Sequence, residues 1–243
     1  MTKTKTVLTL MIAGLWLAGA RSADAQTAGA QDTKFFLDVN AGAQFLHHTV
    51  DSNQSFPLYD ETATVTASQS TGNGVLFDLG IGYRFMPQFG VALGFSAVSS
   101  SADAPLTAKI PNPVFFDQPL TIQSTATDLK RTERDLHLRL IWFTPVNDKI
   151  DVALSAGLSA IRLRQDIPSG TVAPGTQNFT ATPVQESATA IGLNLGFDGT
   201  YLVTPKVGIA LMLHFVTGSV DLPSATSVGV GGLQTGVGVH VRF

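Results

Sequence analysis

The final stretch of this chain, Leu233-Gln234-Thr235-Gly236-Val237-Gly238-Val239-His240-Val241-Arg242-Phe243, decides its fold. Apolar residues and one threonine alternate along it with glycine, polar or charged residues, up to the terminal carboxylate. A period of two residues predicts a β-strand with one apolar face. An aromatic residue at the very end is unusual for a soluble domain, whose termini are usually polar and frayed. The stretch therefore favours a membrane β-barrel over an ordinary edge strand.

Seven segments upstream show the same alternation, and each sets Leu, Val, Ile or Phe against glycine and polar residues. They are residues 35–45, 74–85, 89–98, 127–143, 150–164, 188–203 and 207–218. Short connections with a proline (86–88, 144–149, 204–206) alternate with long polar ones (50–73, 99–126, 165–187, 220–228). Aromatic residues such as Tyr83, Trp142 and Tyr201 cluster beside the short connections. Short turns on one side and long loops on the other are typical of a transmembrane barrel.

The glycines of the polar face separate a barrel in lipid from a soluble calycin-like barrel or sandwich. Gly80, Gly94, Gly157 and Gly196 are examples of the 23 glycines in the chain. Glycine is poor in an exposed strand, but it suits the crowded inside of a small closed barrel. Charged residues make up only 14% of the 243 residues, which fits a surface that faces lipid.

The first 25 residues have the pattern of a cleaved signal peptide. Lys3 and Lys5 precede an apolar run over residues 7–20, and Ala23-Asp24-Ala25 matches a cleavage site. The run is too short for a comfortable membrane anchor, which is the alternative. We expect export of residues 26–243 as one β-barrel domain. The formal net charge of −3 argues against a nucleic-acid partner, and the lack of cysteine excludes disulfides and thiol chemistry.

The strand pattern, the proline-bearing turns and the terminal Phe243 resemble the small outer-membrane barrels of the OmpA, OmpX and OmpW type. The resemblance implies an all-β fold, an eight-stranded antiparallel up-and-down transmembrane β-barrel in a Gram-negative outer membrane. It also implies that barrel-assembly machinery recognises Val239, Val241 and Phe243 as an assembly signal. The chain ends with this strand, so no peptidoglycan-binding domain is expected.

Charged residues on the inward face are predicted to form a network that plugs the lumen, because buried charges must be paired. The residues expected in it are Asp38, Asp78, Arg84, Arg139, Asp151, Asp198 and Arg242. The alternative is that the same pairs line a gate or narrow ion path.

Sites for chemistry are weakly supported by the sequence. Only His47 and His48 are adjacent histidines, and neighbouring strand residues face opposite ways, so neither a metal site nor a cofactor is expected. An enzyme would need a serine or carboxylate beside a histidine at the outer rim, where we place His47, His48 and His214. No nucleophile motif surrounds them, so catalytic residues are not predicted and the protein is expected not to be an enzyme.

Two features of the exterior suggest partners. The outward face of residues 127–164 carries Lys130, Arg134, Arg162 and Arg164 with no acid among them, which predicts a patch that binds the phosphates of lipopolysaccharide. The long loops 50–73, 99–126 and 165–187 are expected to be mobile and to meet any extracellular ligand. Their exposed apolar residues would be Phe115, Phe116 and Phe179.

Three functions remain open from the sequence. The first is a structural or surface-interaction barrel in the outer membrane, with lipid and lipopolysaccharide around it. The second is a small pore or transport conduit. The third is a lipid-modifying enzyme of the outer membrane.

Overall fold

The computed structural model describes residues 33–45, 48–58, 60–112, 114–115, 118–172 and 179–243. The predicted signal peptide lies outside these residues. The strands of the described part are β1 (Phe35–Phe45), β2 (Thr49–Leu58), β3 (Glu61–Ser70), β4 (Gly74–Met86), β5 (Phe89–Ile110), β6 (Leu120–Pro145), β7 (Ile150–Val172), β8 (Phe179–Leu202), β9 (Val207–Leu222) and β10 (Ala225–Arg242). No helix in this part is long and apolar enough to span a membrane.

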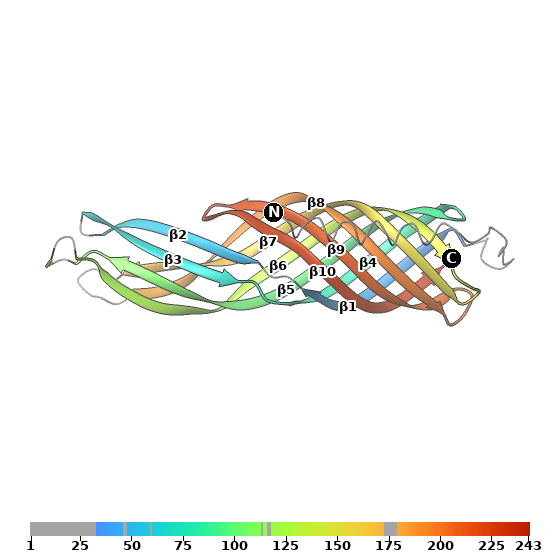
Figure 1. The fold of residues 1–243 in the computed structure, drawn as a ribbon, viewed down its shortest axis with the longest axis horizontal. Helices are drawn as coiled ribbons and strands as arrows, with labels where there is room; N and C mark the ends of the chain where they lie inside the picture. Colours follow the sequence, from blue (N-terminus) through green and yellow to red (C-terminus); the bar gives the residue numbers. More distant parts are fainter. Residues whose placement is uncertain (1–32, 46–47, 59, 113, 116–117, 173–178) are drawn as a thin grey trace, which may run out of the picture. The chain divides into compact units, whose positions relative to one another are not determined.

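Eight of these strands close into an antiparallel ring in the order β5-β4-β1-β10-β9-β8-β7-β6, with β6 returning to β5 (Figure 1). The first and last strands, β1 and β10, pair with each other in this ring. Val39 pairs with Val239, and the backbone N–H of Phe243 donates to the carbonyl oxygen of Phe35 at 2.9 Å. All eight predicted strands are present in this ring, so the predicted eight-stranded up-and-down barrel is confirmed.

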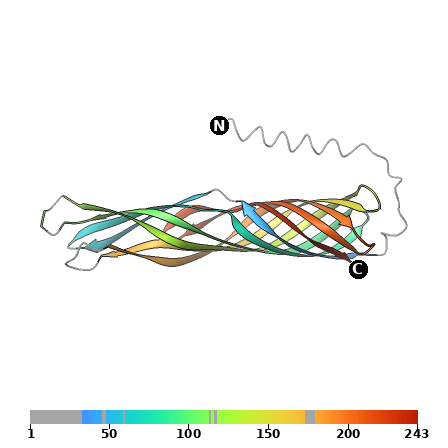
Figure 2. The ribbon, with the colours of Figure 1, turned by 90° about the horizontal axis from the view of Figure 1, so that it is seen from below.

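The long connections were predicted as mobile loops in which only parts such as residues 121–127 extend the strands, and this underestimated the amount of strand. Most of residues 99–126 and 165–187 extend the pairing of β5 with β6 and of β7 with β8 beyond the ring. Most of residues 50–73 form the β2–β3 hairpin, which joins the sheet where Thr64–Ala67 pair with Leu106–Lys109. Figures 1 and 2 show this extension continuing past the ring, at the end away from the C-terminus.

The polarity of both barrel faces reverses along the long strands. On β5, Leu93 and Phe95 point outward and are 54% and 39% exposed, whereas the inward-facing Ser96 is fully buried. Farther along the same strand the inward face carries Leu106 and Ile110, both buried, and the outward face becomes mostly polar. The ring thus has an apolar outside and a polar inside, and the extension has the opposite arrangement.

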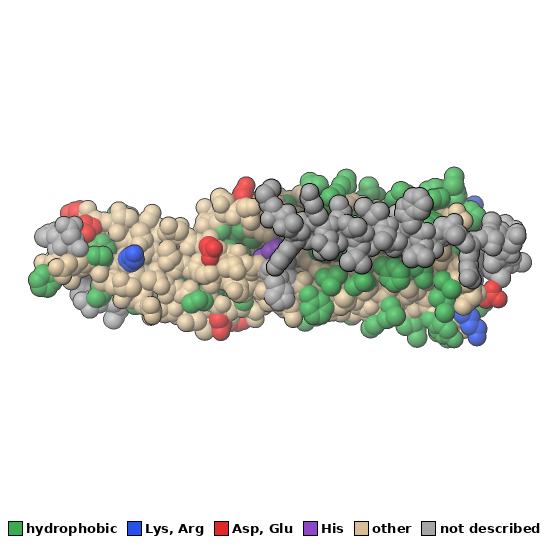
Figure 3. Space-filling view, viewed as in Figure 1, with side chains coloured by type: hydrophobic (Ala, Val, Ile, Leu, Met, Phe, Trp, Pro, Cys, Tyr) green, Lys and Arg blue, Asp and Glu red, His purple; other side chains and the backbone are tan. Residues whose placement is uncertain are grey.

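The reversal divides the surface into two zones. Figure 3 shows hydrophobic side chains gathered over the ring and few of them over the extension. Inside the extension, apolar clusters replace the polar lumen, and one contains Ala67, Leu106 and Leu129. A band of exposed Leu, Val, Ile and Phe around a barrel is what a wall facing lipid requires.

Candidate functional site

The inward side chains of the ring form polar layers that follow one another along the barrel. In the layer near the short turns, Asp38 Oδ1 contacts His240 Nδ1 at 2.5 Å, and Arg242 Nε donates to His240 Nε2 at 3.1 Å. Asp151 Oδ2 accepts from both Arg242 at 2.6 Å and Arg84 at 3.0 Å. This layer therefore joins four strands across the lumen. They are β1, β4, β7 and β10, and β10 contributes both His240 and Arg242.

The guanidinium of Arg84 has a second contact in this layer. Its Cζ lies 3.7 Å from the centre of the Phe143 ring, within the range of a cation–π interaction. Phe143 in turn packs edge-on against Phe36. Aromatic rings therefore fill the space around the ion pairs at this end.

The second layer is centred on Arg139. Its Nη2 donates to Asp78 Oδ2 at 3.2 Å, and its Nη1 lies 3.3 Å from His214 Nδ1. His214 Nε2 contacts Asp198 Oδ1 at 2.9 Å, and Asn40 donates to Asp78 at 3.0 Å. Gly94 makes room for this arginine, because a Cβ at that position would lie 2.5 Å from Nη2.

A third layer joins serine, histidine, aspartate and asparagine side chains by hydrogen bonds. Ser96 Oγ lies 3.0 Å from His137 Nε2 and donates to Asp135 at 3.2 Å. Ser159 Oγ lies 2.7 Å from His137 Nδ1 and accepts from Asn194 at 2.8 Å. All five side chains are buried, so this pairing of serine with histidine has no visible access for a substrate.

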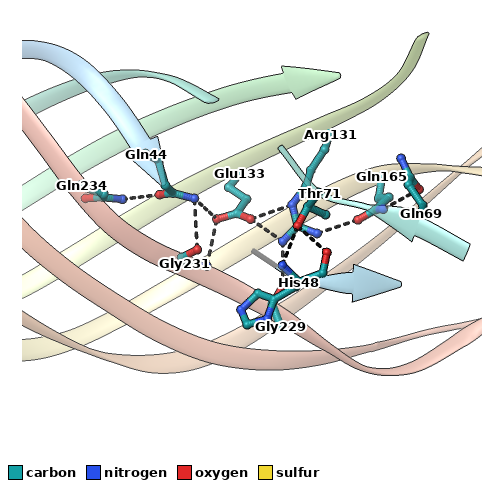
Figure 4. Close-up of polar contacts among 10 residues, drawn as sticks. All are labelled: Gln44, His48, Gln69, Thr71, Arg131, Glu133, Gln165, Gly229, Gly231 and Gln234. Atoms are coloured by element: carbon teal, nitrogen blue, oxygen red, sulfur yellow. Dashed lines mark hydrogen bonds and ion pairs between the residues drawn. The ribbon is translucent and has the colours of Figure 1, made fainter. Parts of the chain in front are cut away.

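The fourth layer closes the lumen below the apolar interior of the extension (Figure 4). A run of side-chain hydrogen bonds crosses from β10 to β3. Its members, in order, are Gln234, Gln44, Glu133, Arg131, Gln165 and Gln69. A cavity of about 10 Å³ beside Gln44, Arg131 and Glu133 has room for about one water molecule.

The seven residues predicted for the lumen network all point inward. Asp78, Arg84, Arg139, Asp151 and Arg242 form ion pairs, and Asp38 and Asp198 each contact a histidine. They form two groups, one around Asp151 and one around Arg139, and among the described residues no side-chain hydrogen bond joins the two groups. The sequence analysis placed His214 at the outer rim, but this side chain lies inside the ring and links Arg139 with Asp198. The sequence analysis expected His240 to face inward but did not assign it to the network, in which it links Asp38 with Arg242. It also missed the glutamines of the fourth layer. Each of these glutamines occupies an inward-facing position in the alternation of its strand, and this could have identified them from the sequence.

Metal and catalytic sites were not expected. In the described residues, no group of three or more His, Asp or Glu side chains is arranged to hold a metal ion. His48 is exposed and follows the end of β1, and His47 lies outside the described residues.

The four cations predicted as a surface patch lie together on the outer wall of β6 and β7. Arg134 pairs in register with Arg162, and Thr132 with Arg164. Arg134 follows directly on the apolar band, since the outward-facing Leu136 is 57% exposed. The expectation that no acid shares this face was wrong. Asp166 lies on it, and its Oδ2 accepts the backbone N–H of Lys130 at 3.1 Å.

The apolar residues predicted for the loops are only partly described. Phe115 is 60% exposed in the connection between β5 and β6. Phe116 and the side chain of Phe179 lie outside the described part of the chain.

No family model and no curated protein match this chain. Among solved structures, Neisserial surface protein A is 18% identical, with 86% of this chain and 97% of that chain covered and a TM-score of 0.47. Outer membrane protease OmpT from Escherichia coli is 10% identical, with 90% and 99% covered and a TM-score of 0.49. The N-terminal β-barrel domain of Pseudomonas aeruginosa OprF is 13% identical, with 87% and 98% covered and a TM-score of 0.40. These similar structures are outer-membrane barrels, and one of them is an enzyme.

Proposed function

We propose that this chain is an integral outer-membrane barrel with a structural or surface-interaction role and a lumen closed to ions. The observation that carries the proposal is the reversal of polarity between ring and extension. The ring needs lipid outside it, whereas the extension buries its apolar residues as a water-exposed protein does. In this arrangement the short turns face the periplasm and the extension faces the cell exterior.

Closure of the lumen is supported by the stacked polar layers. An eight-stranded barrel leaves little space once its inward side chains are in place. Here those side chains meet across the lumen at several levels, and the cavity beside the fourth layer is about 10 Å³. A conducting path would need these contacts to open together.

The first experiment measures conductance. Purified protein that shifts in gel mobility on heating, as a folded barrel should, is inserted into planar bilayers. We expect no discrete channel openings, because Gln44 bonds to Glu133 across the fourth layer and Arg242 bonds to Asp151 across the first. Steady single-channel currents would contradict the closed lumen and favour the pore. An unchanged mobility on heating would contradict the membrane barrel itself.

We further propose that Lys130, Arg134, Arg162 and Arg164 bind lipopolysaccharide phosphates at the upper edge of the apolar band. Arginine pairs with phosphate in bidentate fashion, and cations at the membrane interface carry little cost. Asp166 reduces the local positive charge beside Lys130, so Arg134 and Arg162 are the residues on which binding depends most.

Replacing all four cations with glutamine should lower the amount of lipopolysaccharide that copurifies with the protein, with the heat shift retained. The matched control replaces Lys34, Lys149 and Lys206, which are exposed near the short-turn end, with glutamine. This control reduces the positive charge by a similar amount but leaves the patch intact. Equal loss in both variants would show a general charge effect and contradict the patch.

The remaining partner we propose is the barrel-assembly machinery. Val239 and Phe243 point outward from β10 and are 46% and 53% exposed, so they are accessible on the strand that would be presented. Residues 1–25 are proposed to direct export and to be removed.

A further inference from the structure

The extension has an open side. β2 pairs with β3 along its whole length, and no described strand pairs with its other edge. The register of β8 with β9 begins at Leu193, so the part of β8 before that residue also lacks a described partner on that side. Figure 1 shows β2 at the margin of the extension, beyond the closed ring. A free strand edge carries unpaired N–H and C=O groups that can accept another strand.

A groove borders this edge of β2. It has a volume of about 680 Å³ and is lined by Asn53–Leu58 of β2, by Ser169 and Gly170 of β7, and by Pro223 and Ser224 between β9 and β10. The turn between β9 and β10 is bonded to β8, since Glu186 Oε2 accepts the backbone N–H of Ser224 at 3.1 Å. The groove thus has a strand edge on one side and an anchored turn as another boundary.

Pro57 indicates which backbone groups of β2 face this groove. Proline has no N–H to donate, so within a sheet it occupies positions whose nitrogen points away from the neighbouring strand. Pro57 is opposite Thr62 of β3, and Ser55 and Asn53 lie two and four residues before it. Alternate residues of an antiparallel strand direct their backbone groups to the same side. Ser55 and Asn53 therefore present N–H and C=O to the free edge.

The charged residues of the strands that border the open side are acidic, whereas β5, the next strand after β3, carries Lys109 opposite Thr64. β2, β3, the free part of β8, and β9 and β10 beyond the ring carry Asp51, Glu61, Glu186 and Asp221, with no lysine or arginine in these segments. An occupant with positive charge would be attracted. A second copy of this chain would bring acids against acids.

From these observations we infer that the extension binds an extended cationic segment of another protein, which adds as a strand along the free edge of β2. Backbone hydrogen bonds would give the affinity, and the acids would select lysine- or arginine-containing segments. This inference rests on the proposed function in one respect, namely that the extension faces the cell exterior.

The experiment measures binding of a fluorescein-labelled ten-residue peptide of alternating lysine and valine to the purified full chain in zwitterionic detergent. Ser55→Pro removes an N–H from the free edge, and Ser55→Ala removes only the exposed hydroxyl. We expect the proline variant to bind about tenfold more weakly, as for a lost hydrogen bond, and the alanine variant to bind within about twofold of the original. Equal affinity of both variants would overturn the inference.

Changes to the peptide keep the test independent of the folding of any variant. A peptide N-methylated at every residue cannot form the ladder, and one with glutamate in place of lysine loses the charge match. Both should bind at least about tenfold more weakly, and undiminished binding of the methylated peptide would overturn strand addition. Concentration-dependent dimerisation blocked by Ser55→Pro would instead assign the edge to a second copy. Binding in detergent but not on intact cells would contradict the outward orientation and leave the groove assignment standing.

Discussion

Replacing Arg139 with alanine should lower the free energy of unfolding of the barrel by about 3–5 kcal/mol, the scale for breaking a buried ion pair. Asp78, whose side chain is 2% exposed, would lose its arginine partner. His214 would lose the neighbouring guanidinium as well. The measurement is urea unfolding of the protein in lipid vesicles, followed by tryptophan fluorescence and by the heat shift.

Arg134→Ala is the matched control for this experiment. Arg134 lies on the same strand but points outward and is exposed, so its removal should change the unfolding free energy by less than about 1 kcal/mol. A loss for Arg139→Ala as small as that of the control would contradict the view that the layers hold the barrel together.

The second large effect is expected at Gly157 of β7, which pairs with Arg139 and with Asn194. A Cβ at this position would overlap the backbone carbonyl oxygen of Leu138, which cannot move without breaking the ladder. Gly157→Ala should therefore cost about 3 kcal/mol or more, at the upper end of overpacking effects, and sharply reduce the yield of heat-shifted protein.

Gly199→Ala is the control, because a Cβ there would meet nothing within 4 Å. This variant should fold in normal yield. If Gly157→Ala folded equally well, β6 and β7 would have to be farther apart at this level than their pairing implies.

The ring could be predicted from the sequence because each of its strands is apolar on one face and glycine-rich or polar on the other. Most of the extension, apart from residues 121–127, was missed because many of its outward residues are serine, threonine and proline, which are common in loops. Residues 62–67 illustrate this, since Ala63, Val65 and Ala67 alternate with threonines, a pattern that also suits a half-buried strand. Apolar residues alternate as regularly over residues 104–110, but two of the four are alanines, whose small side chains make the hydrophobic pattern less distinct.

The partners of the lumen side chains could not be predicted from the alternation of residues along the strands. Parity assigned Asp38, Arg84 and Arg242 to the inside, but it could not say which acid meets which base. Those partners depend on strand tilt and on the ring closing between β5 and β6. A register shift between Ala102 and Ala104, opposite the positive φ of 56° at Asp128, was likewise invisible in the sequence. This register shift lies farther from the ring than Lys130, so it does not change the face on which the four cations lie.

The reversal of polarity also sets the depth at which the molecule sits in its membrane. If a strand slid by two residues, every side chain would still point to the same face of the barrel. The alternation of inward and outward residues therefore does not prevent such a slide. It would nevertheless move the wall by about 7 Å along the strand. In one direction Arg134 and Arg162 would enter hydrocarbon, and in the other Leu136 and Leu158 would enter water. The outward faces of β6 and β7 therefore each contain a boundary between arginine and leucine that fixes the strand's depth, and the pairing of Arg134 with Arg162 places the two boundaries at the same height.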